Sequence, residues 1–171
     1  MFLDRDGTII EDRGYLSDPA QVVFFSDTVP ALNRLQEQYD LFIVTIQSVV
    51  ANSLTTSRDV ERVNAYILAH LAASGIRVVE TYVCPHARGN DCRCMKPQPY
   101  FLRKAETDYG IDLLNSYVIG DHPHDVEFAE KGGAKGIYVL TGHGAKHRPE
   151  LAEGAAVADG IREAAEIILN C

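Results

Sequence analysis

The chain has 171 residues, of which 46% are hydrophobic, and this is enough to bury one substantial core, so we predict a single domain over residues 1–171. Its 24 Asp and Glu residues outnumber its 16 Lys and Arg residues, and the formal charge of −8 argues against binding to nucleic acid or to an anionic membrane. No apolar run reaches the ~18 residues of a membrane span and no signal-peptide pattern is present, so a cytoplasmic monomer is expected.

Five short apolar runs predict buried strands, and apolar residues at helical spacing predict helices between them. The strands are expected at 2–3, 41–44, 78–83, 117–119 and 137–140, and the helices near 29–35, 63–71, 101–105 and from about 125 onward. Because strands and helices alternate, and continuous apolar strands suit a sheet covered on both faces, we predict a three-layer α/β fold, doubly wound around a central parallel sheet. Residues 142–158 show the least pattern.

Ligands in such folds bind beyond the carboxyl ends of the strands. The polar residues that follow the predicted strands are Asp4, Thr45, Cys84 and Asp121. We therefore expect the functional site to be built from these residues and their sequence neighbours.

The first of these positions opens the run Asp4-Arg5-Asp6-Gly7-Thr8. Two carboxylates two residues apart at the end of a strand can face the same side and reach one phosphate group. A divalent cation would remove the charge repulsion, so Asp4 suits a nucleophile and Asp6 suits a proton donor to the leaving oxygen. The alternative is a solvated acidic turn in which Asp6 or Thr8 caps a helix.

The string from Phe2 to Thr8 resembles the first signature of the haloacid dehalogenase (HAD) superfamily of phosphohydrolases. The resemblance implies a Rossmann-like fold in which Asp4 is the nucleophile and Asp6 is the general acid and base. It also implies a Mg²⁺ ion held by the Asp4 carboxylate and the Asp6 backbone carbonyl.

Later positions match the order that the superfamily pattern requires. Thr45 would donate its hydroxyl to a phosphate oxygen, and the Lys96 ammonium would neutralise charge on the transferring phosphoryl group. Asp121 would bind Mg²⁺, and Asp125 would be a further ligand or lie directly behind the ligands. The alternative for Asp125 is the N-cap of the following helix, and it can serve both uses.

Two histidines accompany these carboxylates. His122 and His124 are two residues apart across a proline, a spacing that gives no chelating helix face. We therefore interpret them as ordinary loop histidines and not as zinc ligands or catalytic acids.

Three of the four cysteines crowd with one histidine into residues 84–94. Three thiols and one imidazole on a short loop fit one tetrahedral zinc ion, and residues 89–91 favour the reversal between the two ligand pairs. Four protein ligands would fill the coordination sphere, so the zinc would be structural. The alternatives are a disulfide, which the close spacing disfavours, and unligated core thiols; Cys171 has no evident partner. The predicted zinc ligands are Cys84, His86, Cys92 and Cys94.

With this cluster, residues 1–145 resemble the branch of the superfamily that contains D-glycero-D-manno-heptose 1,7-bisphosphate phosphatases and histidinol-phosphatase domains. The resemblance implies that a zinc-pinned loop, in place of a large cap domain, shapes the pocket, and that Thr45, Gln47, Ser48 and Lys96 bind substrate. The implied function is Mg²⁺-dependent hydrolysis of a small sugar phosphate, or of a bisphosphate of the heptose type. Histidinol phosphate is the alternative substrate, and a non-catalytic phosphate-binding protein is the alternative of another class.

The chain departs from that branch at four positions. Ile46, Val49 and Asn52 stand where the branch usually has Asn, Gly and Arg, and Met95 stands where it usually has Arg. Losing an amide and two cations would weaken the binding of a second phosphate, because the pocket would hold fewer fixed charges and donors. The candidates to replace the lost cations are Arg58 and Arg93.

Overall fold

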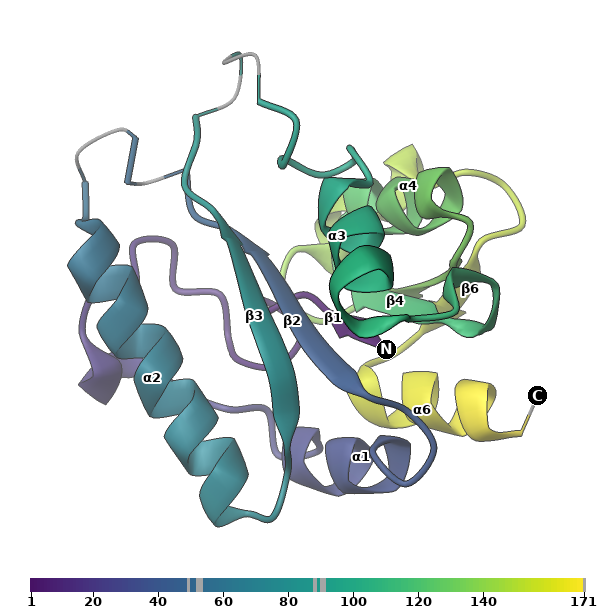
Figure 1. Ribbon diagram of the computed structural model, residues 1–171, viewed down its shortest axis with the longest axis horizontal. Coiled ribbons are helices and arrows are strands. Elements are labelled where there is room, and N and C mark those ends of the chain that lie inside the picture. Colours follow the sequence, from purple (N-terminus) through teal and green to yellow (C-terminus); the bar gives the residue numbers. More distant parts are fainter. Residues whose placement is uncertain (49, 52–53, 88, 90–91, 171) are drawn as a thin grey trace.

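The computed structural model describes residues 1–48, 50–51, 54–87, 89 and 92–170, and its centre is one six-stranded sheet (Figure 1). The strands lie in the order β3-β2-β1-β4-β5-β6, and every neighbouring pair is parallel. Their bounds are β1 Phe2–Leu3, β2 Leu41–Ile46, β3 Val78–Cys84, β4 Tyr117–Gly120, β5 Lys135–Val139 and β6 Ala156–Ala158.

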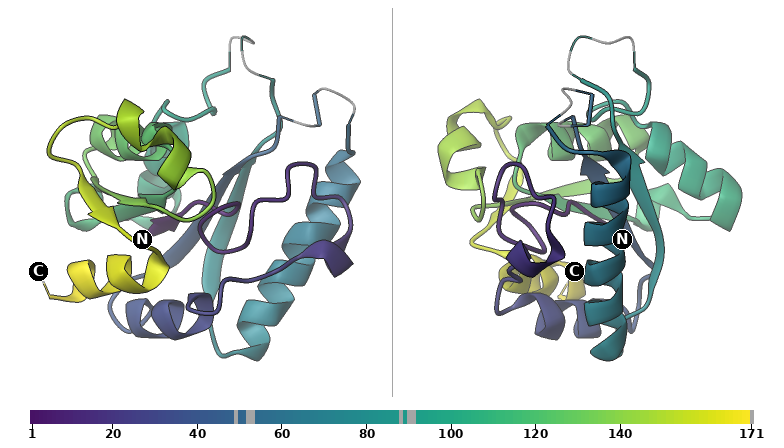
Figure 2. Two further views of the ribbon diagram at one scale, coloured as in Figure 1. Left: turned by 180° about the vertical axis from the view of Figure 1, so that it is seen from behind. Right: turned by 90° about the vertical axis from the view of Figure 1, so that its left-hand side faces the viewer.

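Helices cover both faces of this sheet and give three layers. Side chains of α1, α2 and α6 share one core cluster, and side chains of α3 and α4 share the other. In Figure 2, α1 and α6 lie side by side below the sheet. The helices are α1 Thr28–Leu35, α2 Ser57–Ala73, α3 Tyr100–Tyr109, α4 Pro123–Gly132, α5 Gly144–His147 and α6 Ile161–Leu169, with 3₁₀ turns at Pro19–Gln21, Leu113–Asn115 and Arg148–Glu150.

The two core clusters explain why the strands are continuously apolar. Successive side chains of a strand point to opposite faces, so Leu41 and Ile43 enter one cluster while Phe42 and Val44 enter the other. Phe42 stacks on Phe2 of the neighbouring strand with 5.0 Å between ring centroids. Both faces of the sheet are therefore buried, which confirms the predicted α/β architecture.

The structure differs from the predicted elements at several places, and it contains helix α6, which was not predicted. Strand β2 continues to Ile46, so Thr45 lies within the strand and not just beyond it. Helix α2 begins at Ser57, several residues earlier than predicted, because Thr56 and Asp59 form a capping box at its start. The weakly patterned residues 142–158 contain α5 and β6, two elements too short to show a period.

The order of strands along the sheet reverses direction between β1 and β4, and this place is the topological switch point of the fold. The chain passes from β1 outward to β2 and β3 and then returns to the other side of β1. The backbone N–H of Asp4 donates to the carbonyl of Ile119 at 2.9 Å, so the residues that follow β1 and β4 lie side by side. No domain is inserted between consecutive strands of the described chain, and none of its helices is long and apolar enough to span a bilayer.

Candidate active site

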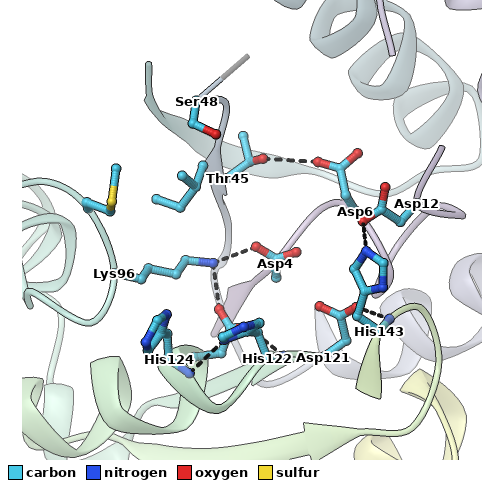
Figure 3. A pocket seen from close by; sticks show the side chains of 13 residues that line it. Asp4, Asp6, Asp12, Thr45, Ser48, Lys96, Asp121, His122, His124 and His143 are labelled. Carbon is cyan, nitrogen blue, oxygen red and sulfur yellow. Dashed lines mark hydrogen bonds and ion pairs between the residues drawn. The ribbon is translucent and has the colours of Figure 1, made fainter. Parts of the chain in front are cut away.

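A cavity of about 350 Å³ opens at the carboxyl edge of the sheet, over the switch point (Figure 3). Of the predicted site residues outside the cysteine cluster, seven line it and Gln47 does not. The seven are Asp4, Asp6, Thr45, Ser48, Lys96, Asp121 and Asp125.

Lys96 lies between two carboxylates at the centre of the cavity. Its ammonium is 2.6 Å from Oδ1 of Asp4 and 2.7 Å from Oδ1 of Asp125, and its side chain is only 4% exposed. Burial alone would lower the pKa of Lys96, but the charges of Asp125 and Asp4 outweigh it and the pKa is raised. The lysine is therefore a fixed positive charge beside Asp4.

Asp121 is held on the opposite side of Asp4 by backbone groups. The N–H of His143 donates to its Oδ2 at 2.7 Å. Gly7 and Gly142, with φ of 80° and 55°, pack so closely that a Cβ atom on either would overlap the Asp121 carboxylate. The backbones of the two glycines therefore pack directly against the Asp121 carboxylate and restrict its position.

The charge balance of the cavity fits a divalent cation. Burial raises the pKa of Asp4 well above its ordinary value despite Lys96, because Asp125 and Asp121 add further negative charge. One ammonium cannot compensate several carboxylates packed in a poorly solvated site. Carboxylate oxygens are the ligands that Mg²⁺ prefers, so the donors offered by Asp4 and Asp121 suit this ion.

Asp6 is oriented by four donors. Arg5 donates from Nε to Oδ2 and from Nη2 to Oδ1, both at 3.0 Å, and Nη1 of Arg5 donates to Oδ1 of Asn64 on α2 at 2.7 Å. Gln47 donates to Oδ2 at 2.9 Å, and the Thr45 hydroxyl lies 3.3 Å from the same atom. Gln47 thus contacts Asp6 and not the cavity. The role of Arg5 was missed in the sequence, although an arginine next to a buried strand needs an acidic partner.

The prediction that His122 and His124 lie in an ordinary loop is wrong, because both lie at the start of a helix. That they are neither zinc ligands nor catalytic acids stays a prediction. Helix α4 begins at Pro123, His122 is its N-cap and His124 lies in its first turn, and both histidines line the cavity. Nδ1 of His122 accepts from the N–H of His124 at 3.2 Å, while Asp125 accepts from the N–H of His122 at 3.1 Å. Asp125 is therefore the third helical residue, where it completes a capping box and also pairs with Lys96.

Two further cavity residues were not found in the sequence. Nε2 of His143, which follows β5, lies 3.0 Å from Oδ2 of Asp12, which follows β1. They are 131 positions apart and neither belongs to a recognisable motif, so only the packing of the two loops brings them together. Met95 and Ile46, two of the departures from the branch pattern, also line the cavity. Val49 and Asn52 lie outside the described residues.

The four predicted zinc ligands converge beside the active site. Their ligand atoms all lie within 4.8 Å of one another, with Cys92 Sγ 3.0 Å from Nδ1 of His86 and 3.2 Å from Cys94 Sγ. Cys84, Cys92 and Cys94 are free thiols, so the disulfide alternative is wrong. The residue types and the convergence of their ligand atoms suit one tetrahedral zinc site. Asn90, Asp91 and Cys171 lie outside the described residues.

The two arginines named as candidates to replace the missing cations lie away from the cavity. Arg93 places its guanidinium 4.8 Å from the ring centroid of Tyr100, and Arg58 is exposed in the first turn of α2. Neither residue lines the cavity.

Comparisons with known proteins agree with this geometry. A family model described as HAD-hydrolase-like matches residues 93–164. The D-glycero-beta-D-manno-heptose-1,7-bisphosphate 7-phosphatase of Yersinia pestis is 32% identical over 171 aligned residues, which cover 94% of this chain and 88% of that protein. The chain belongs to the heptose-bisphosphate phosphatase branch of the HAD superfamily. It is a phosphatase, in the class of phosphoric monoester hydrolases.

Two other relatives extend the match. The D-glycero-alpha-D-manno-heptose-1,7-bisphosphate 7-phosphatase of Campylobacter jejuni is 36% identical over 129 residues, covering 74% of this HAD phosphatase and 73% of that protein. A crystal structure of D,D-heptose 1,7-bisphosphate phosphatase from B. bronchiseptica, in complex with magnesium and phosphate, has a TM-score of 0.91 and 28% identity. The superposition covers 99% of this chain and 97% of that one.

The stability of the metal-free HAD phosphatase is expected to depend on pH through Asp121. Burial raises the pKa of this carboxyl to about 7, from an ordinary value of 3.8. The folded protein then keeps a proton that the unfolded chain loses, so the contribution of Asp121 to stability falls as pH rises from about 4 to about 7. The quantity to compare is the unfolding free energy of the wild type minus that of Asp121→Asn. This difference should fall by about 2 kcal/mol between pH 5 and pH 7.5.

Urea unfolding of both proteins at the two pH values measures this difference. The protein is kept free of Mg²⁺ by dialysis and not by a chelator, which would also remove any metal that the cysteine cluster binds. Added Mg²⁺ should reverse the trend in the wild type, because an ion that takes Asp121 as a ligand binds the ionised carboxylate. A difference that does not change with pH would contradict the prediction.

Proposed function

We propose that this HAD phosphatase is a Mg²⁺-dependent phosphomonoesterase that acts on a small sugar phosphate through an aspartyl-phosphate intermediate on Asp4. The observation that carries the proposal is the position of the Asp4 carboxylate, which lies beside the Lys96 ammonium and shares its cavity with Asp121 and Asp125. These groups offer a nucleophile, a fixed positive charge and a set of oxygen ligands within one site.

In the first step, an Asp4 carboxylate oxygen attacks the phosphorus atom and the bond from phosphorus to the substrate oxygen breaks. The Asp4 and Asp121 carboxylates and the Asp6 backbone carbonyl would hold a Mg²⁺ ion, which would supply the charge neutralisation that lets an anion approach a phosphate. Lys96 neutralises the remaining oxygens of the transferring group. Asp6 donates its proton to the departing alkoxide, which leaves as an alcohol.

In the second step, a water molecule attacks the phosphorus atom of the acyl phosphate. Asp6, now ionised, accepts a proton from this water, the bond between phosphorus and the Asp4 oxygen breaks, and inorganic phosphate leaves. Arg5 and Gln47 donate hydrogen bonds to the Asp6 carboxylate, which fixes its direction. Ser48 adds a hydroxyl donor for the phosphate at the cavity wall, and Thr45 adds another when its hydroxyl turns from Asp6 to the phosphate.

We further propose that Cys84, His86, Cys92 and Cys94 bind one structural zinc ion. The support is the convergence of their four ligand atoms within 4.8 Å. The loop that they pin continues directly into Met95 and Lys96, both of which line the cavity.

The names of the relatives suggest which substrates to test. Proteins named for the 7-phosphatase reaction on heptose 1,7-bisphosphate are similar over most of this chain, so heptose phosphates are the first candidates. Histidinol phosphate is the second, because histidinol-phosphatase domains belong to the branch that the sequence resembles. A protein that only binds phosphate esters is the alternative of another class.

Phosphate release from a panel of esters tests the proposal. With Mg²⁺, the wild type should hydrolyse at least one heptose or hexose phosphate, and removing Mg²⁺ by dialysis should abolish the release. Phenyl phosphate in the panel detects turnover that does not depend on the alcohol. Tight binding without release from any ester, in a folded protein, would favour the binding alternative.

A further inference from the structure

Histidines line the edge of the cavity that lies opposite Thr45 and Ser48 and adjoins Asp121 (Figure 3). We call it the histidine wall; its members are Asp12, His122, His124 and His143 (Figure 3). The mechanism above uses none of these side chains. The wall joins three segments, which follow β1, β4 and β5 respectively.

The three histidines of the wall differ in how their ring nitrogens are hydrogen-bonded. His143 is fixed twice, since its N–H donates to Asp121 and its Nε2 lies 3.0 Å from Asp12. Nδ1 of His122 accepts the N–H of His124, so the proton of a neutral His122 ring is on Nε2. The His124 ring lies 4.5 Å from the His122 ring, and within the described chain no hydrogen-bond partner reaches its nitrogens. His124 therefore offers both ring nitrogens to a ligand.

These groups both donate and accept hydrogen bonds. An imidazole offers an N–H, and a carboxylate such as that of Asp12 only accepts. A hydroxyl group matches this mixture because it donates and accepts, whereas a phosphate dianion only accepts. The wall therefore suits the hydroxyl groups of a sugar or polyol.

The charges of the cavity oppose a second phosphate. Five carboxylates line it, and the proposed Mg²⁺ ion and the Lys96 ammonium, which Asp4 and Asp125 already share, offset only part of their charge. Among the described residues, no arginine lines the cavity, and Ile46 and Met95 present uncharged side chains to it. A second dianion would meet acidic groups with no cation of its own.

We propose that the histidine wall recognises the alcohol half of the substrate, and that this half carries hydroxyl groups and no second phosphate. The enzyme then prefers a sugar or polyol monophosphate to the matching bisphosphate. This inference rests on the proposed function, and it assigns Asp12, His122, His124 and His143 as specificity residues.

Two substrates with the same scissile group test the preference. In the presence of Mg²⁺, kcat/KM for heptose 7-phosphate should exceed kcat/KM for heptose 1,7-bisphosphate by about tenfold, the value of one well-placed interaction. A higher kcat/KM for the bisphosphate would overturn the proposal. If the wild type hydrolyses no ester, the proposed function fails, and calorimetric binding of the same two compounds then decides the preference separately.

A gain of charge gives a second test. Met95→Arg places a cation at the cavity and should raise the ratio of kcat/KM for bisphosphate over monophosphate about tenfold above that of the wild type. An unchanged ratio would show that charge at the cavity does not set the preference, and would contradict the argument from missing cations.

Substitution in the wall tests recognition of hydroxyl groups. His124→Asn should lower kcat/KM for heptose 7-phosphate about tenfold more than kcat/KM for phenyl phosphate, which has no hydroxyl groups on its alcohol half. His70→Asn is the matched control, because His70 is exposed on α2 and does not line the cavity. Equal losses on both substrates, with an unchanged melting temperature, would overturn the assignment.

Discussion

Replacing Asp4 with asparagine is expected to lower kcat by a factor of about 10³ or more, because an amide cannot attack phosphorus. The change keeps the size of a side chain that is 13% exposed and leaves Lys96 paired with Asp125 at 2.7 Å. The protein should therefore stay folded, with a melting temperature within a few degrees of the wild type. Phosphate release and thermal unfolding measure the two expectations.

The intermediate gives an independent measurement. Wild-type enzyme quenched in acid during turnover of a ³²P-labelled ester should retain label that hydroxylamine removes, as expected for an acyl phosphate, and Asp4→Asn should retain none. Asp108→Asn is the matched control, since Asp108 is exposed on α3 and pairs only with Lys104 among its described neighbours. Activity above a tenth of the wild type in a folded Asp4→Asn protein would exclude Asp4 as the nucleophile.

Losing the cysteine-bound metal is expected to weaken both the fold and the activity. Cys94→Ser removes one of four converging ligands, so the protein should no longer retain one zinc per chain. We expect a destabilisation of about 3 kcal/mol, or about 6–12 °C in melting temperature for a chain of this size. Since Lys96 lies two residues beyond Cys94, kcat/KM should also fall, by roughly 10–100-fold.

Metal analysis by mass spectrometry, thermal unfolding and phosphate release measure these three effects. Cys171→Ser is the matched control, because this fourth cysteine is not one of the four ligands, and it should change none of them. A wild-type protein that binds no thiophilic metal, or a Cys94→Ser variant that keeps its full zinc content, would contradict the proposed centre.

The sequence predicts the centre of the fold well because strong physical constraints act there. A strand buried on both faces must be continuously apolar, and this makes β2 and β4 visible without a structure. The place of Asp4 and Asp121 in the site is predicted from these strands, because the carboxyl ends of neighbouring parallel strands meet at one edge of the sheet. The cysteine cluster is equally local, because its ligands lie within eleven positions.

The parts that sequence analysis missed depend on contacts between distant segments. The pair formed by Asp12 and His143 exists only because the loops after β1 and β5 pack together. The contact of Arg5 with Asn64 requires α2 to lie over the end of β1. His122 was misplaced because histidine is an unusual N-cap, and its capping bonds depend on the geometry of the turn before α4.

The two-residue strand β1 has a consequence for the order in which the protein folds. It lies between β2 and β4, which belong to the two halves of the sheet, and Asp4 is tied to Ile119 and to Lys96, 92 positions away. A strand this short gains little from pairing with one neighbour, and its contacts close very long loops. A partly folded chain with only one half of the sheet in place therefore contains the nucleophile but no working site, so catalytic competence requires both halves of the sheet.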